Sequence, residues 1–459
     1  MLQYFSQRVL KSSKFASNIQ KNCDSTAFPL SINGILNISC NFVGLMHYRM
    51  KRFLYFPLIV LLASCSQTKN SDFIVTVTND QDFDREELVE VPISAIAERV
   101  RLIDEEQYIV LDAKGDQVPY QITYDDNLLF PVAIEADAEV AYTVAVGHPV
   151  EVESSVYGRH YPERLDDMTW ENDRSAYRAF GPASQAQGER DYGYDVWVKR
   201  VPELVVEQRY SKEFDPETTA EIARLRKARN YKEANALYQT VSYKVDHGDG
   251  LDCYAVGPTL SCGTAALLKG NDILYPHCWR EYEIMEDGPY RFTVKLTYNP
   301  MAVGRDSVVE TRIISLDKGS QLNKTVVTYA GLNSTMPVAT GLAVRKSNPY
   351  AYVLEGEKGY MAYADLTDDL DNGNGVIYTG AVMPQKVKEV APVMFSEKEA
   401  KERGALGHVL AISNYKPESE YVYYWGAGWS KYGYLTMESW AAHLERYAQR
   451  VRNPLKVTF

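Results

Sequence analysis

Residues 292–298 read FTVKLTY, and this stretch decides the fold class. Its apolar side chains occupy every second position, at Phe292, Val294, Leu296 and Tyr298. Because successive side chains of a β-strand point to opposite faces of a sheet, one face of this strand is apolar and the other is polar. The pattern therefore predicts a half-buried antiparallel strand, with a turn before it at Gly288 and Pro289.

Similar runs extend in both directions along the chain. Those that follow occur at the spacing of a meander, at residues 308–316, 324–329 and 338–344. Those far upstream are shorter and are separated by Asp, Asn and Gly, at residues 73–77 and 142–146. Many strands with short connections predict an all-β fold, in which residues 151–459 form a large antiparallel sandwich and residues 66–150 a small N-terminal β-sandwich segment.

Two segments have helical periodicity. In residues 216–240 apolar positions recur about every 3.6 residues, so we expect a helix inserted between strands. Residues 436–451 begin at Thr436, a suitable N-cap, and carry Arg446 and Arg450 in the last turns, where the helix dipole favours cations. We expect this C-terminal helix to pack on the sandwich and close the domain.

The N-terminal region has the layout of an exported lipoprotein. Residues 50–64 contain two basic residues, an apolar run and small residues directly before Cys65. The run is far shorter than the roughly 20 residues of a membrane-spanning helix, which favours a cleaved signal peptide with lipidation at Cys65. The alternative is a secretory leader without lipid. Residues 1–49 have no usable periodicity, and we interpret them as an upstream start-site extension.

Charge and cysteine content limit the partners and the compartment. The chain has a formal net charge of −12, and loss of residues 1–64, which hold seven Lys/Arg and one Asp, makes it −18. This argues against nucleic acid as a partner, and an acidic ligand would need arginines in its site. Cys253, Cys262 and Cys278 are expected to be buried free thiols, with a Cys253–Cys262 disulfide as the alternative. The expected location is the cell envelope, with the lipid anchor as the membrane contact.

A dense polar cluster lies at residues 170–182, WENDRSAYRAFGP. Glu171, Asn172, Asp173 and Arg174 directly follow Trp170. An aromatic face can stack on a sugar ring and an arginine fork can bind a carboxylate, so this cluster is a candidate site for a sugar acid. An ion-paired strand edge would have the same composition.

A second cluster, at residues 245–254, contains one histidine among three aspartates and a tyrosine. Its chemically active side chains include His247, Asp249, Asp252 and Tyr254. Histidine beside carboxylates can serve as a general acid or base near neutral pH. The alternatives are a surface turn and a metal site formed by His247, Asp249 and Asp252.

Three tryptophans could line a sugar-binding cleft or belong to the core, namely Trp197, Trp425 and Trp429. Residues 365–374 concentrate carboxylates without the EF-hand spacing, which favours a solvated turn over a calcium site. The nucleophile elbow, the zinc-protease motif and the phosphate-binding loop are missing from the sequence. Their absence argues against esterase, metalloprotease and nucleotide-dependent functions.

Four stretches together resemble an exported bacterial family labelled a domain of unknown function, which is associated with breakdown of uronic-acid polysaccharides such as pectin and ulvan. They are WENDRSAYRAFGP at 170–182, YDVWVKR at 194–200, DHGDGLDCYAVGP at 246–258 and WGAGWSKYGYLTMESW at 425–440. The resemblance implies a galactose-mutarotase-like β-supersandwich preceded by a small β segment. It also implies kinship with the oligosaccharide dehydratase described for ulvan degradation.

The implied reaction is elimination of water from the terminal uronate of an oligosaccharide, which yields a 4,5-unsaturated sugar. On this resemblance Arg174, helped by Asn172, would hold the carboxylate and stabilise the enolate. His247 and Tyr254 would share the roles of base and acid. The remaining expected sugar contacts are Glu171, Asp173, Trp197, Asp249, Asp252 and Trp429. No cofactor is expected, although a divalent cation could take the place of Arg174 at the uronate.

Two other functions stay open on the sequence. A polysaccharide lyase would use the same kind of site, but it would expel a sugar and would need an open cleft for the chain. A non-catalytic glycan-binding lipoprotein would depend on Trp197, Trp425 and Trp429 and not on His247.

Overall fold

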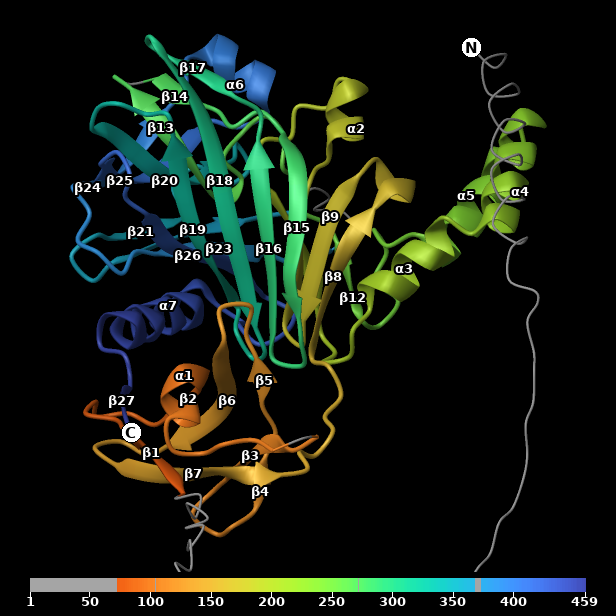
Figure 1. Cartoon of the computed structure of the whole chain (residues 1–459). Coiled ribbons are helices and arrows are strands. Elements are labelled where there is room, and N and C mark those ends of the chain that lie inside the picture. Colours follow the sequence, from red (N-terminus) through yellow and green to blue (C-terminus); the bar gives the residue numbers. More distant parts are fainter. Residues whose placement is uncertain (1–71, 104, 271, 368–372) are drawn as a thin grey trace, which may run out of the picture. The chain divides into compact units, whose positions relative to one another are not determined.

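The computed structural model describes residues 72–103, 105–270, 272–367 and 373–459, which fold mainly into antiparallel sheets (Figure 1). The predicted extension at 1–49, the signal peptide at 50–64 and the lipidation site Cys65 lie outside these residues. Within the described ranges, none of the helices has both the length and the apolar character needed to cross a membrane.

The largest sheet has nine strands. Their order is β15 (Trp279–Asp287), β16 (Arg291–Tyr298), β18 (Asp306–Asp317), β19 (Leu322–Ala330), β26 (Tyr421–Trp429), β23 (Ile377–Val382), β22 (Tyr360–Asp365) and β21 (Tyr352–Glu355), with β17 (Met301–Val303) paired to β18.

Two further sheets of five strands complete the sandwich. One has the order β14 (Asp272–Leu274), β13 (Cys262–Lys269), β20 (Met336–Val344), β25 (Gly407–Tyr415) and β24 (Glu389–Met394). The other has the order β12 (Gly250–Asp252), β11 (Tyr194–Lys199), β10 (Ser175–Ala179), β9 (Asp167–Asn172) and β8 (Val156–Tyr161). The predicted all-β sandwich is thereby confirmed.

The stretch that predicted the fold class forms β16. Its alternating apolar side chains are all buried in the main core, which they share with residues of β18, β19 and β26. Phe292 lies opposite Leu316 of β18 and Asp287 of β15. The strands expected at 308–316, 324–329 and 338–344 are β18, β19 and β20.

Trp425 lies at the centre of this core and does not line a cleft. Its ring stacks on Tyr194 with centroids 4.0 Å apart and an interplanar angle of 7°. Its edge meets Trp170 at 6.4 Å, and its Nε1 donates a hydrogen bond of 2.8 Å to Oγ1 of Thr325. This arrangement follows the rule that buried aromatic rings keep their polar edge satisfied.

The N-terminal segment has its own core and two small sheets. One has the order β27 (Lys456–Thr458), β1 (Phe73–Thr78), β7 (Glu139–Gly147), β3 (Gln107–Leu111) and β4 (Gln117–Val118). The other has the order β2 (Arg85–Pro92), β6 (Asn127–Ile134) and β5 (Gln121–Ile122). β27, from the end of the chain, pairs with β1, so residues 456–458 also belong to the first of these sheets.

The helical insertion consists of three helices, where one was predicted. They are α3 (Val206–Glu213), α4 (Pro216–Lys227) and α5 (Tyr231–Val241). Arg229 ends α4 in the left-handed conformation at φ 60°, and the N–H of Asn230 donates to the carbonyl of Leu225 at 2.9 Å. This is a Schellman motif with arginine where glycine is usual, so no glycine marks the break between the two helices.

The predicted C-terminal helix is α7 (Met437–Arg452), and its expected cap is confirmed. The side chain of Thr436 accepts a hydrogen bond from the N–H of Ser439 in a capping box. Trp440 and Leu444 are buried against residues of β22 and β23. The remaining short helices are α1 (Ile93–Ala97), α2 (Pro182–Ala186), α6 (Glu397–Arg403) and a 3-10 turn at Pro162–Arg164.

A glycine in β13 allows the close packing of Trp425, and we predict that Gly263→Ala destabilises the fold. Gly263 has φ 135°, and a Cβ there would lie 2.4 Å from Cβ of Trp425. Gly270→Ala is the matched control, since Gly270 has φ 63° and no atom within 4 Å of its added Cβ. The control should cost about 1–2 kcal/mol from its backbone conformation, and overpacking should add about 1–3 kcal/mol at Gly263. Denaturant unfolding measures both, and equal losses would contradict the steric role of Gly263.

Candidate active site

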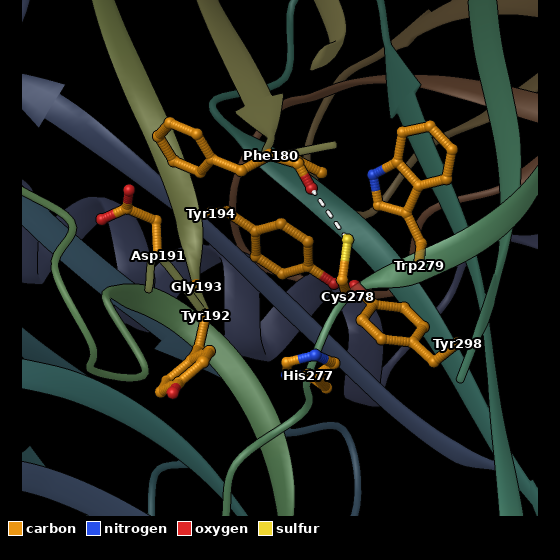
Figure 2. A pocket seen from close by; sticks show the side chains of 10 residues that line it. Phe180, Asp191, Tyr192, Gly193, Tyr194, His277, Cys278, Trp279 and Tyr298 are labelled. Atoms are coloured by element: carbon orange, nitrogen blue, oxygen red, sulfur yellow. Dashed lines mark hydrogen bonds between the residues drawn. The ribbon is translucent and has the colours of Figure 1, made fainter. Parts of the chain in front are cut away.

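A pocket opens where strands of two different sheets end. It lies at the end of β10 and the start of β11 in one sheet, and at the start of β15 and the end of β16 in the other (Figure 2). It is a shallow hollow, and the space of about 230 Å³ around its lining includes open solvent. The residues that line it are Ala179, Phe180, Asp191, Tyr192, Gly193, Tyr194, His277, Cys278, Trp279 and Tyr298.

Hydrogen bonds to the backbone fix the segment that enters β15. Nε2 of Gln185 donates to the carbonyl oxygen of His277 at 2.6 Å, and the N–H of Asn299 donates to that of Cys278 at 3.2 Å. The thiol of Cys278 faces the carbonyl oxygen of Phe180 at 3.9 Å, as Figure 2 shows. The backbone of His277 is therefore held in place while its side chain is exposed.

Two tyrosines of the pocket contact a buried arginine. Nη1 of Arg312 donates to the hydroxyl of Tyr194 at 2.9 Å, and its guanidinium lies 4.3 Å from the ring centroid of Tyr298. Glu310 accepts from Nε of Arg312 at 2.5 Å, and both charged side chains are fully buried. These contacts leave Tyr194 and Tyr298 little freedom to move.

The carboxyl group of Asp191 has a pKa raised above its ordinary value. Burial is the largest cause, and the negative charge of Glu189 acts in the same direction. A hydrogen bond from the backbone of Gly257 and the charge of Arg178 oppose the rise in pKa. A carboxyl of raised pKa in a pocket can hold its proton to higher pH, which suits a general acid.

The rim beside Asp191 carries a phenol and a cation. Nε of Arg190 donates to the hydroxyl of Tyr192 at 3.3 Å, and the side chain of Arg190 is exposed. The ring of Tyr192 lies 5.4 Å from that of Tyr275, on which the guanidinium of Arg403 sits at 4.0 Å. The pocket thus combines aromatic walls with an imidazole, a phenol, a carboxyl and a neighbouring arginine.

The cluster at 170–182 is mostly internal, which corrects two predicted sugar contacts. Glu171 is 1% exposed and binds Nζ of Lys199 at 2.7 Å and the N–H of Val206 at 2.7 Å. Asn172 is buried and donates to the carbonyl oxygens of Asp317 and Ser320. Their polar atoms are engaged within the protein, as expected of buried polar groups, so they are not available to a ligand.

Asp173 and Arg174 form the turn between β9 and β10. The side chain of Arg174 is 48% exposed, with its Nε 3.4 Å from the carboxylate of Asp173. Asp173 also accepts from the N–H of Gly319 at 2.6 Å. Both residues lie at the end of this sheet opposite to the strand ends that line the pocket, because Arg174 precedes β10 and the pocket residue Ala179 ends it.

His247 and Tyr254, the predicted acid–base pair, lie on either side of β12. His247 is exposed and lies three residues before β12, with Nε2 3.1 Å from the carbonyl oxygen of Ser242. Tyr254 lies two residues beyond the other end of β12 and is 6% exposed. Burial raises the pKa of Tyr254 well above its ordinary value.

Asp252, a predicted sugar contact, belongs to a buried group of carboxylates around Arg178. Its Oδ2 accepts from Nη2 of Arg178 at 2.9 Å, and Asp195 accepts from the same nitrogen. Asp167 lies 3.5 Å from Nη1 of Arg178. Burial raises the pKa of Asp195 to about 7 and that of Asp167 to about 6.

The other predicted sugar contacts also have protein partners. Asp249 pairs with Arg209 at 2.9 Å. Trp197 is fully buried and stacks on Tyr243 at 4.7 Å. Trp429 is 2% exposed and donates from Nε1 to the carbonyl oxygen of Asn374 at 2.8 Å. These side chains stabilise the fold in the structure.

The metal alternatives gain no support from the part of the chain that the structure describes. No group of three or more His, Cys, Asp or Glu side chains is arranged there to hold a metal ion. Residues 368–372 of the acidic stretch at 365–374 lie outside the described residues. Cys253, Cys262 and Cys278 are free and buried, as expected.

The pocket residues were missed because no local run marks them. Asp191 and Tyr192 lie in the loop before β11, and His277 lies in the loop before β15. Each is followed within three residues by a buried aromatic, Tyr194 or Trp279, which anchors the loop in the core. A polar residue directly beside a buried strand end is the one signal that could have indicated them.

Two comparisons cover most of the chain. The family described as "Domain of unknown function (DUF4861)" matches residues 77–457. A relative from Formosa agariphila, named "Uncharacterized protein P7", is 26% identical over 424 residues, which cover 87% of this chain and 96% of the relative.

Two solved structures are distantly similar, each at 9% identity. They are an α-mannosidase from Enterococcus faecalis V583, with a TM-score of 0.39, and a protein of glycosyl hydrolase family 38 from Enterococcus faecalis, with a TM-score of 0.42. The similarity covers 84% of this chain and 45% and 47% of theirs, so the chain spans less than half the length of either. Similarity at this level carries no information on activity.

We predict that Lys199→Met lowers the free energy of unfolding by about 3–5 kcal/mol, because it leaves the buried carboxylate of Glu171 without its cation. The matched control is Lys295→Met, whose pair with Glu283 at 3.2 Å is exposed and should contribute less than about 1 kcal/mol. Chemical denaturation measures both variants. If the two variants were equally stable, Glu171 would not have the structural role assigned to it.

Proposed function

Given that the chain belongs to the family described as Domain of unknown function (DUF4861), we propose a function from the chemistry of its pocket. The protein is a carbohydrate-active lyase that removes water from the terminal uronic acid of an oligosaccharide. One observation carries this proposal: an imidazole, a phenol and a carboxyl of raised pKa line the same aromatic-walled pocket. Acid–base groups support elimination, and aromatic walls suit the apolar face of a sugar ring.

The reaction needs a base, an acid and a group that holds the carboxylate. His277, the exposed imidazole, takes the C5 proton, since histidine is the side chain that most often acts as a base. The electrons of the C5–H bond form the C4=C5 double bond as the C4–O4 bond breaks. Asp191 protonates the departing O4, which leaves as water. His277 then releases the proton it has taken to solvent, and Asp191 takes up a new proton from solvent.

Arg190 and Tyr192 are the groups proposed to hold the uronate. The substrate carboxylate carries extra negative charge when C5 loses its proton, and donors aimed at that charge lower the barrier. The exposed guanidinium of Arg190 already donates to the hydroxyl of Tyr192, so both donors converge on one point of the rim. This pairing takes the role that the sequence assigned to Arg174 and Asn172.

The proposal includes export and lipid anchoring at Cys65, which the layout of residues 50–64 favours. An enzyme on the cell envelope would meet oligosaccharides released from acidic polysaccharides. The net charge of −18 without residues 1–64 would repel such substrates in general. Arg190, exposed on the rim beside Asp191, reduces that repulsion where the substrate binds.

We predict that His277→Ala lowers the rate of unsaturated uronate formation by about 10²- to 10⁴-fold, the range of a lost general base. The substrate is a saturated oligosaccharide with a terminal uronate, and the readouts are ultraviolet absorbance of the new double bond and a product lighter by one water. His247→Ala is the discriminating variant, because it removes the exposed histidine of the turn before β12. If that variant loses activity and His277→Ala does not, the reaction takes place at the other end of the sheet.

The same incubation separates the two rival functions. A chain-cleaving lyase would release shorter saccharides, and product mass would show this directly. A non-catalytic binder would bind the intact oligosaccharide in calorimetry and yield no product over long incubation. Addition of a chelator tests whether a divalent cation assists at the uronate, since only a cation-dependent enzyme would lose activity.

A pH profile tests the role of Asp191. As the proton donor it must be protonated, and its raised pKa keeps it so at a pH where ordinary aspartates are ionised. Activity should therefore fall as the pH rises through that pKa. Asp191→Asn cannot donate in this way and should lower kcat by about 10²-fold or more while abolishing this decline. An unchanged pH profile in the variant would exclude Asp191 as the acid.

A further inference from the structure

A β-bulge at the start of β15 places two aromatic side chains on one face of the nine-stranded sheet. Trp279 lies opposite Tyr298, and the next partner pairs are Glu281 with Thr297 and Tyr282 with Leu296, which leaves Arg280 as the extra residue. Tyr298 and Leu296 both point into the core, so Trp279 and Tyr282 share that face. Without the bulge, a spacing of three residues would place them on opposite faces.

Tyr282 nevertheless remains open to solvent. β15 is the terminal strand in the order of its sheet, and Tyr282 is 42% exposed, while Trp279 is 3% exposed. The two ring centroids are 5.6 Å apart at an interplanar angle of 82°. An aromatic wall thus continues from the pocket, which Trp279 lines, onto the exposed ring of Tyr282.

A histidine from the neighbouring sheet completes an aromatic cluster of Trp279, Tyr282 and His160. The ring of His160 on β8 lies 4.9 Å from Tyr282 and 5.9 Å from Trp279. Its Nε2 is 3.2 Å from the carboxylate of Asp166. The pKa of the Cys278 thiol, which lines the pocket, is raised by burial and, to a smaller extent, by the negative charge of Asp166. Asp166 therefore lies close to the pocket.

The turn that presents Asp166 is held in an unusual backbone conformation. Leu165 and Asp166 have φ of 58° and 65°, a left-handed region that residues other than glycine rarely adopt. Gly181 permits the contact, because a Cβ there would lie 1.8 Å from the carbonyl oxygen of Asp166. Strained turns of this kind collect at functional sites, where they orient a side chain.

From this geometry we propose that Tyr282 and the His160–Asp166 pair form a second sugar subsite, which binds the unit next to the terminal uronate. This inference rests on the proposed function, because it extends the same substrate beyond the pocket. The exposed ring of Tyr282 packs against the apolar face of the second sugar, and the ring of His160 beside it contacts the hydroxyls of that sugar. The carboxylate of Asp166 repels an anionic unit, so the second sugar is neutral.

The inference names a substrate class. The substrate is an oligosaccharide of at least two units, with a uronate at the end and an uncharged sugar next to it. Three probes separate the contributions of the two units: the methyl glycoside of glucuronate, cellobiouronic acid (glucuronate joined to glucose) and a disaccharide of two galacturonate units. Wild-type protein should prefer cellobiouronic acid to both others.

Tyr282→Ala is the decisive variant. It should raise KM for cellobiouronic acid roughly tenfold, the equivalent of about 1.4 kcal/mol, because the stacking face is lost. It should leave kcat within about twofold and leave KM for the methyl glycoside unchanged. Tyr282→Phe keeps the ring and should restore KM. Tyr231→Ala is the matched control, since Tyr231 on α5 is 58% exposed and lies outside the pocket and the aromatic cluster.

The outcomes separate this inference from the proposed function. If Tyr282→Ala binds and converts cellobiouronic acid as the wild type does, the second subsite is overturned while the dehydratase stands. If wild type converts none of the probes, the dehydratase is overturned, and calorimetry with cellobiouronic acid then decides on the subsite. Binding that weakens in Tyr282→Ala supports the subsite without catalysis, and equal or undetectable binding overturns it.

Discussion

One buried guanidinium connects the three large sheets. Arg312 lies on β18 of the nine-stranded sheet, its Nη1 donates to Tyr194 of β11, and its Nη2 donates to the carbonyl oxygen of Ala265 on β13 at 3.2 Å. A charge inside a protein is tolerated only when it is paired and hydrogen-bonded, and Glu310 supplies the opposite charge. The three sheets must therefore keep their relative positions for Arg312 to stay satisfied, and Tyr194 of the pocket is held by the same requirement.

The chemistry-bearing side chains lie at strand ends around this rigid centre. Asp191 and Tyr192 precede β11, and His277 precedes β15, so two sheets each contribute a loop to one pocket. Loops on a fixed scaffold are the usual place for such groups, because the scaffold sets their separation while the loops stay accessible. The turns that carry Arg174 and His247 belong to the other end of the sheet formed by β8 to β12. A dehydratase, a chain-cleaving lyase and a sugar-binding protein could all be built on this frame.

The fold was predictable wherever one face of an element is buried and the other is wet. β16 and α7 show this clearly, because the spacing of their apolar residues matches the face of each element that is buried in the core. The break between α4 and α5 was not predictable, since Arg229 occupies the left-handed position where glycine normally marks a helix end. The residues of the pocket were not predicted, for a different reason. Polar runs such as the one with Glu171 and Asn172 are conspicuous in the sequence, but in the fold these two side chains are buried and bind other groups of the protein. The residues that meet at the pocket are revealed only by strand pairing within a sheet, such as Trp279 of β15 opposite Tyr298 of β16, together with the packing of one sheet on another.

The pairing of β27 with β1 affects how the chain reaches its native state. Thr76 and Thr458 are partners in this sheet although 382 positions separate them. The entropic cost of closing such a loop grows only with the logarithm of its length, so the equilibrium penalty is modest. Contacts between distant positions nevertheless form late and slow folding. The sheet of the N-terminal segment is therefore complete only when residues 456–458 are in place beside β1.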